Sequence, residues 1–417
     1  MNHSSNGGTK DPAPTDPSDR IVSLDALRGF ALLGILVINM WYFSLPLAGA
    51  VLPPMYGDFT GANYAAWFVA HVFFEMKFVT LFTIMFGAGI VLFTESKERK
   101  GQRARALHYR RTFWLLVIGL IHAYVFWYGD ILVSYALCGF IIVLAKDWNA
   151  PRLVRVGVAM FAIPSLIYLL IAVMAWTAGP GIDNIGSAIE QGIGATNAAI
   201  AAEIEVYRAG WFDQLSHRAP TAFSLQTVEF AFGNFWQLGG LMLFGMALFK
   251  TGVLSNERSS RFYRRVFLAG GVIGLIITLT GVWYNHYVGW STGEVMLLGF
   301  QFTYWGSIPL AGAYVAGIML WCRWRPDGLA TSALAAVGRT AFSNYLLQTL
   351  IATTIFYGHG FGLFGQISRF EGLGIVLGIW MIQIPVSMVW LRYFRFGPIE
   401  WIWRTLTYRT RQPMRKA

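Results

Sequence analysis

The chain has 417 residues, of which 56% are hydrophobic and 13% are charged, and its formal net charge is +11. Soluble globular proteins carry roughly 25% charged residues, so this composition excludes an ordinary soluble domain and indicates a polytopic membrane protein in a lipid bilayer. Lys and Arg accumulate in the cytoplasmic loops of such proteins, so the positive charge predicts no nucleic-acid partner. The two cysteines, Cys138 and Cys322, lie in or beside apolar stretches and predict neither a disulfide framework nor a thiolate metal site.

Residues 1–19 are rich in Ser, Gly, Pro and Asp and predict a disordered cytoplasmic tail. The first apolar stretch lacks a small-residue cleavage site at its end, which favours a retained helix over a removed signal peptide. Ten apolar stretches are each predicted to form a transmembrane helix: 24–45, 64–94, 112–129, 131–146, 153–178, 228–250, 266–288, 297–321, 335–357 and 373–394.

Basic residues alternate between successive loops and predict the orientation of the chain. The connection "KERKGQRARALHYRR" and the connection "RSSRFYRR" are densely basic, whereas the first loop has neither Lys nor Arg. Because basic loops stay in the cytoplasm, both termini are predicted to be cytoplasmic. The all-α fold is expected to divide into membrane halves at 20–178 and 228–394, an extracytoplasmic loop at 179–227, and a basic amphipathic cytoplasmic tail at 395–417.

The second apolar stretch, 64–94, is too long for a straight crossing and is predicted to tilt or to break near Glu75. His71 and Glu75 are four residues apart, so they can form a hydrogen bond along one helix face. Lys77 points to the opposite side and lies near mid-membrane, where a lysine needs a carboxylate or an anion. Its position predicts either an anchoring cation in a binding site or a structural ion pair.

The segment "LIHAYVFWYGDIL" places a histidine and a carboxylate in a short helical hairpin. His122 is expected near the membrane midplane, where it can act as a general base or can satisfy a backbone carbonyl across a helix contact. Asp130 is expected at the outer end of the hairpin. Helical geometry separates Asp130 from His122 unless the hairpin folds back on itself.

Span one contributes a polar stripe that begins near the cytoplasm. Asp25 and Arg28 are three residues apart and can pair, and Asn39 returns to the same face eleven residues after Arg28. This stripe predicts either an interfacial ion pair with a packing asparagine or one wall of a polar cavity.

The C-terminal half adds further polar residues within apolar stretches. Gln237 lies near mid-depth in span six, and Thr340, Asn344 and Gln348 are spaced by four in span nine. Such stripes either join transmembrane helices or line a site. "RYFRFGPIEWIWRTLTYR" predicts an amphipathic interfacial helix that begins after Gly397–Pro398. The chain has no phosphate-binding loop, dinucleotide fingerprint, metal-ligand spacing or nucleophile elbow, so no permanently bound cofactor or metal is expected.

Five motifs in order give the chain a family resemblance. "SLDALRGFALLGILVINM", "KFVTLFTIMFGAGI", "GLIHAYVFWYGDILVSYALCG", "GRTAFSNYLLQTL" and "RYFRFGPIEWIWRTLT" resemble the YeiB-type family of bacterial inner-membrane proteins, whose C-terminal half is domain of unknown function family 418. The opening motif is also similar to the start of the heparan-α-glucosaminide N-acetyltransferases. Those enzymes belong to a wider group that moves an acyl group from coenzyme A to an extracytoplasmic sugar or amine. Their reactive histidine has no aligned counterpart here, so His122 is the better candidate.

The resemblance implies an acyltransferase with acyl-CoA as co-substrate and a small-molecule or glycan acceptor. His122 would be the base, Asp130 would orient it, and Arg28, Lys77 and Arg339 would supply positive charge to the donor. A transporter in which Lys77, Glu75 and His122 carry substrate or protons is a second hypothesis. A non-catalytic membrane component is a third.

Overall fold

The computed structural model describes residues 21–177 and 181–416 of the chain. The described residues are helical, and an isolated bridge between Phe394 and Arg415 is the one β-type pairing among them. The all-α prediction is therefore confirmed. The predicted disordered tail, 1–19, lies outside the described residues.

The helices fall into three groups along the chain. The N-terminal half contains α1 (Val22–Ser44), α2 (Leu47–Val51), η2 (Pro53–Met55), α3 (Gly61–Phe73), α4 (Lys77–Arg99), α5 (Ala104–Ile121), the π-helical turn η3 (His122–Phe126), α6 (Leu132–Ile142), η4 (Val143–Ala145) and α7 (Ala150–Thr177). The connecting segment contains α8 (Ile182–Gly192), α9 (Asn197–Arg208) and α10 (Leu215–Gln226). The C-terminal half contains η5 (Phe230–Asn234), α11 (Phe235–Lys250), α12 (Ser260–Tyr287), α13 (Thr292–Glu294), η6 (Val295–Gly299), α14 (Phe300–Trp324), α15 (Leu329–Arg339), α16 (Ala341–Phe356), α17 (Arg369–Tyr393) and α18 (Pro398–Tyr408).

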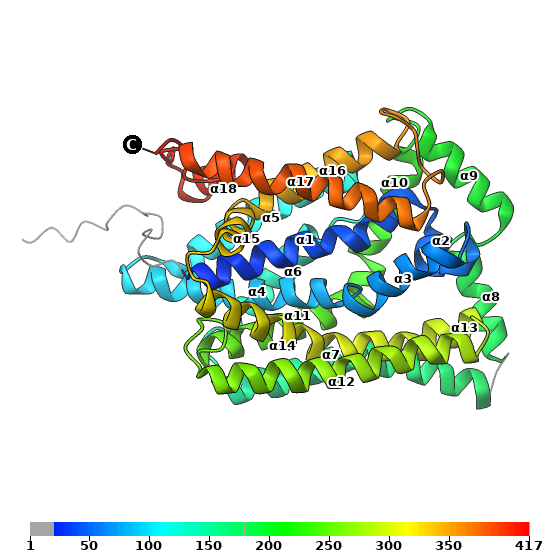
Figure 1. The fold of residues 1–417 in the computed structure, drawn as a ribbon, viewed down its shortest axis with the longest axis horizontal. Helices are drawn as coiled ribbons and strands as arrows, with labels where there is room; N and C mark the ends of the chain where they lie inside the picture. Colours follow the sequence, from blue (N-terminus) through cyan, green and yellow to red (C-terminus); the bar gives the residue numbers. More distant parts are fainter. Residues whose placement is uncertain (1–20, 178–180, 417) are drawn as a thin grey trace, which may run out of the picture.

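The long helices run side by side, with α1 in the middle (Figure 1). In the view of Figure 1, α16 and α17 lie on one side of α1, and α7, α12 and α14 lie on the other. In the most apolar 18-residue stretch of α1, 67% of the residues are buried, whereas in that of α12 only 22% are buried. Most residues of this α12 stretch therefore lie at least partly exposed on the protein surface, as expected of a helix with one face toward lipid.

Among the described residues, seven segments are long and apolar enough to cross a membrane: Val22–Ser44, Gly61–Arg99, Ala150–Thr177, Leu215–Lys250, Ser260–Tyr287, Thr292–Trp324 and Arg369–Tyr393. The chain is therefore a multi-pass membrane protein. The three other predicted crossings fall on α5, on the shorter apolar helix Leu132–Ala145, and on α15 with α16. The total of ten crossings stays a prediction.

The break predicted near Glu75 lies between α3 and α4. Met76 adopts a left-handed backbone conformation with φ of 63°, and the Glu75 amide donates to the Ala70 carbonyl instead of the carbonyl four residues back. The α3–α4 segment thereby spans 39 residues with a bend in the apolar region. Of the two predicted ways to fit the long apolar stretch 64–94 into the membrane, a tilt or a break near Glu75, the structure shows the break.

The segment 179–227, expected as a loop, is largely helical where it is described. Helices α8, α9 and α10 lie at the end of the molecule opposite the C-terminus (Figure 1). Thr196 caps α9 by accepting a hydrogen bond from the Ala199 amide at 3.2 Å. The short polar stretches between these helices were visible in the sequence, but their packing onto the membrane helices was not.

Candidate functional site

His122 lies at the centre of a buried polar triplet. Its Nδ1 atom lies 2.7 Å from Asp130 Oδ1, and its Nε2 atom lies 2.9 Å from Thr349 Oγ1 on α16. The side chain of His122 is 2% exposed and that of Asp130 is fully buried. A carboxylate on Nδ1 fixes the tautomer that leaves Nε2 available as a proton acceptor, as in other histidine bases.

The hairpin folds back because helix α5 changes its winding at His122. Residues His122–Phe126 form a π-helical turn, and the Trp127 amide donates to the His122 carbonyl at 3.0 Å. Trp127 then stacks on Phe43 of α1, with ring centroids 4.0 Å apart. Asp130 begins the returning half of the hairpin and accepts a hydrogen bond from the Val133 amide at 2.8 Å. Of the two arrangements left open by the sequence, the structure has the hairpin folded back, and this turn brings Asp130 into direct contact with His122.

The connecting segment, which contains α8, α9 and α10, holds the π-helical turn in place. Trp211 Nε1 donates to the Val125 carbonyl at 2.9 Å, and Arg218 Nε donates to the Tyr124 carbonyl at 3.1 Å. These are carbonyls of the turn itself, so side chains from the segment between the two membrane halves bind the irregular backbone beside His122.

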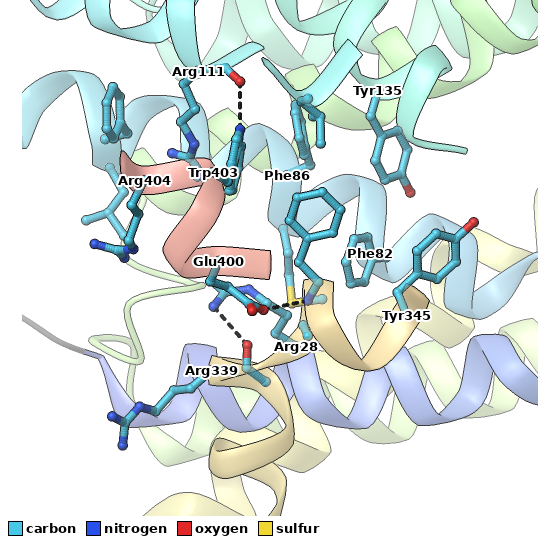
Figure 2. Close-up of a pocket in the computed structure, with 18 of the residues that line it drawn as sticks. Arg28, Phe82, Phe86, Arg111, Tyr135, Arg339, Tyr345, Glu400, Trp403 and Arg404 are labelled. Atoms are coloured by element: carbon cyan, nitrogen blue, oxygen red, sulfur yellow. Dashed lines mark hydrogen bonds between the residues drawn. The ribbon is translucent and has the colours of Figure 1, made fainter. Parts of the chain in front are cut away.

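A cavity of about 330 Å³ opens between α1, α4, α5, α16 and α18 (Figure 2). The charged residues that line it are Asp25, Arg28, Arg111, Arg339, Arg395, Glu400 and Arg404. Five guanidiniums against two carboxylates give this end of the cavity a positive charge. Arg28 and Arg404 lie close enough to Arg111 to repel it electrostatically, so these three guanidiniums form a cluster.

Aromatic side chains line the far end of the cavity. Phe82, Phe86, Tyr135 and Tyr345 lie beyond the arginines in Figure 2. The ring of Tyr345 lies 5.2 Å from the imidazole of His122, centroid to centroid. The cavity therefore leads from the arginine cluster to a position one aromatic ring away from His122.

Helix α18 covers the arginine end of the cavity. Trp403 Nε1 donates to the Arg111 carbonyl at 2.8 Å, and the Arg111 guanidinium lies 4.4 Å from the Trp403 ring (Figure 2). Glu400 accepts hydrogen bonds from the Phe342 amide at 2.7 Å and from Ser343, so it caps the first turn of α16. Burial raises the pKa of Glu400, and these hydrogen bonds oppose the rise. The predicted amphipathic helix after Gly397–Pro398 is present and forms part of this cavity.

Some of the residues predicted from the sequence lie at the cavity. Arg28 Nη1 lies 2.9 Å from Asp25 Oδ1, so the predicted pair forms, and both residues line the cavity together with Arg339. Asn39 is half-buried on α1, eleven residues beyond Arg28 and outside the cavity lining.

Lys77, Glu75 and His71 form a separate polar group at the α3–α4 break. Lys77 Nζ donates to the His71 carbonyl at 2.7 Å, and His71 Nδ1 lies 2.5 Å from Glu75 Oε2. The other ring nitrogen of His71 lies 3.1 Å from Thr303 Oγ1 on α14. None of the three lines the arginine cavity, so the structure does not bring Lys77 or Glu75 to His122.

The polar stripe of span nine faces α17. Asn344 Nδ2 donates to Ser387 Oγ at 2.9 Å, and Gln348 Nε2 donates to Gln383 Oε1 at 2.9 Å. These contacts join α16 to α17, so for Asn344 and Gln348 the structure supports a role in helix packing rather than in lining a site. Gln237 is half-buried on α11 and belongs neither to the triplet nor to the cavity lining.

Sequence reasoning missed Thr349, Tyr345 and Arg111 as parts of the site. Tyr345 and Thr349 are four residues apart and face the hairpin, while Asn344 and Gln348, each one residue earlier, face α17. The same motif thus carries two stripes of polar residues, one facing α17 and one facing the hairpin. The spacing of Asn344 and Gln348 predicted only the stripe that packs on α17. In the sequence, Arg111 ends the basic connection "KERKGQRARALHYRR", whose charge was explained by the orientation of the chain in the membrane.

Comparison with known proteins identifies the family of the chain. Residues 248–410 match the family described as "Protein of unknown function (DUF418)", a match that begins in α11 and includes α18. The chain is 34% identical to the uncharacterized protein YeiB of Escherichia coli (strain K12), over 95% of this chain and 98% of that protein. It is 31% identical to the uncharacterized protein YxaH of Bacillus subtilis (strain 168), over 97% of this chain and 98% of that protein. With similarity of this extent along nearly the whole length, the chain belongs to the YeiB family.

Proposed function

We propose that this protein is an acyltransferase of the bacterial cytoplasmic membrane, which moves an acyl group from acyl-CoA to an extracytoplasmic or lipid-linked acceptor. One observation carries the proposal: the His122–Asp130 pair lies directly behind Tyr345, which lines the inner end of a cavity whose other end is lined by arginines. A nucleotide-bearing donor needs cationic groups at one end and a narrow apolar path at the other, and this cavity offers both.

The arginine cluster supports the binding of the donor's phosphates. Arg28 and Arg111 reach the cavity from α1 and α5, and guanidiniums bind phosphate oxygens with two parallel hydrogen bonds. The aromatic walls beyond them suit the thioester arm, which carries few charges. Because Tyr345 separates the cavity from His122, the thioester meets Nε2 only when the Tyr345 side chain rotates away.

The chemistry assigned to His122 is general base catalysis. Its neutral ring donates the Nδ1 proton to Asp130 and accepts the proton of an acceptor hydroxyl or amine at Nε2. The acceptor oxygen or nitrogen forms a bond to the thioester carbonyl carbon, the carbon–sulfur bond breaks, and the thiolate takes the proton from His122. Without an acceptor, the Thr349 hydroxyl contacts Nε2 and holds the imidazole in the orientation from which an acceptor hydroxyl can replace it.

A transport function has its own supporting observation, which is the second histidine–carboxylate pair at the α3–α4 break. His71, Glu75 and the buried amine of Lys77 form a titratable group within a transmembrane segment, as proton-coupled transporters require. The two functions therefore predict different essential histidines.

The proposed function is tested with inside-out vesicles from cells that overproduce the protein, incubated with radiolabelled acetyl-CoA. We expect acyl label on an endogenous acceptor with wild-type protein and about 100-fold less with His122→Ala, since a general base contributes 10²- to 10⁴-fold. His71→Ala is the matched control, because it removes a buried histidine paired with a carboxylate away from the cavity. Label transfer that survives in His122→Ala would refute the proposal, and label uptake without transfer that is lost in His71→Ala would favour transport.

A further inference from the structure

Arg218 on α10 is fully buried, yet most of its guanidinium has no hydrogen-bond partner. Its Nε atom donates to the Tyr124 carbonyl, and its guanidinium packs 5.0 Å from the ring of Trp211. Both terminal nitrogens, Nη1 and Nη2, are buried without a partner among the described residues. A buried charge is retained only when it is paired, so these nitrogens point to a missing anion.

Arg369 shows how this fold satisfies a buried guanidinium that has no ligand. It is the first residue of α17 and is 3% exposed. Its terminal nitrogens donate to the carbonyls of Tyr56 at 3.1 Å, Gly49 at 2.8 Å and Pro53 at 3.0 Å. The backbone thus folds around Arg369, whereas the same nitrogens of Arg218 are left open. The difference argues that Arg218 serves a ligand.

Two tyrosine hydroxyls share the surroundings of Arg218. Tyr207 of α9 and Tyr357, which follows α16, have rings 4.8 Å apart, and both interact electrostatically with the Arg218 guanidinium. Each of their hydroxyls is also buried without a partner among the described residues. The nearest buried carboxylate on α9, Glu203, accepts instead from the Leu47 amide at 3.2 Å. Four guanidinium N–H groups and two neighbouring hydroxyls are therefore buried without partners among the described residues, and a ligand that accepts hydrogen bonds would satisfy them.

We infer that Arg218, Tyr207 and Tyr357 form an oxyanion-binding site for a phosphate or carboxylate group of the acceptor. The site adjoins the reacting centre, because Arg218 binds the carbonyl of Tyr124, two residues after His122 in the same π-helical turn. His359 is exposed at the surface beside Arg218 and marks the outer side of the site. That the bound oxyanion is part of the acceptor rests on the proposed function. That the site binds an oxyanion does not.

The test measures thermal unfolding of the purified protein with sodium phosphate, sodium succinate or sodium chloride at equal ionic strength. Phosphate or succinate is expected to raise the midpoint of the wild-type protein above its value in chloride, because a ligand of the native state stabilises it. Arg218→Gln is expected to lose this rise. The double variant Tyr207→Phe with Tyr357→Phe removes only two hydroxyls and should weaken the apparent affinity about tenfold or more. Whichever of phosphate and succinate acts at the lower concentration identifies the acceptor's acidic group.

Arg369→Gln is the matched control. It should lower the midpoint in every salt while keeping the rise with the oxyanion, because Arg369 already has protein partners. The inference fails if the wild-type protein responds equally to all three salts, or if the rise persists unchanged in Arg218→Gln or in the double tyrosine variant. His122→Ala should keep the rise, because His122 is not part of the oxyanion site. A wild-type protein that transfers no acyl group but keeps its oxyanion response would reject the acyltransferase and leave this site standing.

Discussion

The Asp130 carboxylate joins His122 to the first turn of α6. One of its oxygens lies 2.7 Å from His122 Nδ1, and the other accepts the Val133 amide at 2.8 Å. The carboxylate that fixes the imidazole is thus itself fixed by a helix N-terminus, where a negative charge is stabilised. The imidazole orientation therefore depends on a helix position as well as on a side-chain contact.

Replacing Asp130 by Asn separates these two roles. Asn keeps the cap on α6 but favours the wrong tautomer of His122, so we expect acyl transfer to fall about 100- to 10,000-fold. The unfolding midpoint should change little, since Asn caps helices as well as Asp does. Transfer rates in vesicles and thermal unfolding in detergent measure the two effects. A rate within threefold of wild type would contradict the role assigned to Asp130.

Thr349 is expected to position His122 through the hydroxyl that contacts Nε2. Thr349→Val keeps the shape of the side chain and removes this contact, so transfer should fall about tenfold, while Thr349→Ser should restore most of it. The effect should appear in the maximal rate and in its pH profile, with the Michaelis constant for acetyl-CoA unchanged. Equal rates in the Val and Ser variants would show that this hydroxyl has no part in the reaction.

The cavity arginines are expected to govern donor affinity. Arg28→Gln and Arg111→Gln should each raise the Michaelis constant for acetyl-CoA about tenfold, and the wild-type constant should rise with ionic strength because salt screens the phosphates. Arg323→Gln serves as the control. Its guanidinium binds Asn256 Oδ1 at 2.8 Å and Ser260 Oγ at 3.0 Å, away from the cavity. A similar rise in the control would assign the effect to overall surface charge.

Glu203 predicts a pH dependence of stability. Burial raises the pKa of this carboxyl to about 7, so the native protein keeps its proton at pH values where the unfolded chain has lost it. Its contribution is complete below about pH 4.5 and is lost as the pH rises through about 7. The wild-type midpoint should therefore fall more between pH 5 and 8 than that of Glu203→Gln. Glu205→Gln, on the exposed side of α9, should follow the wild type, and parallel curves for all three proteins would refute this prediction.

The membrane fold was predictable because the hydrophobic period and the charges of the loops act locally. The break near Glu75 followed from the length of one apolar stretch, and the Asp25–Arg28 pair followed from helical spacing. The contact between His122 and Asp130 did not follow. It depends on a π-helical turn whose carbonyls are bound by Trp211 and Arg218, which come from a segment about ninety residues later.

The site as a whole was only partly predictable for a related physical reason. A polar residue in an apolar helix must be satisfied, but the sequence does not say from which neighbouring helix the partner comes. Asn344 and Gln348 meet their partners on α17, while Thr349, one residue further, meets His122. Successive residues of a helix differ by a rotation of about 100°, which here separates a side chain that packs on α17 from one that contacts His122. Which side chain meets which neighbour depends on the tertiary structure.

Helix α18 links the two ends of the site. Through Glu400 it holds the first turn of the helix that carries Tyr345 and Thr349, and through Trp403 it closes over the arginine cluster. In the proposed reaction, a donor of nucleotide size that binds under α18 would displace this helix, and that displacement would also release the cap on α16. The C-terminal helix α18 would therefore couple donor exchange to alignment of the reacting groups in the proposed reaction, so turnover is expected to be limited by the rate at which this helix lifts.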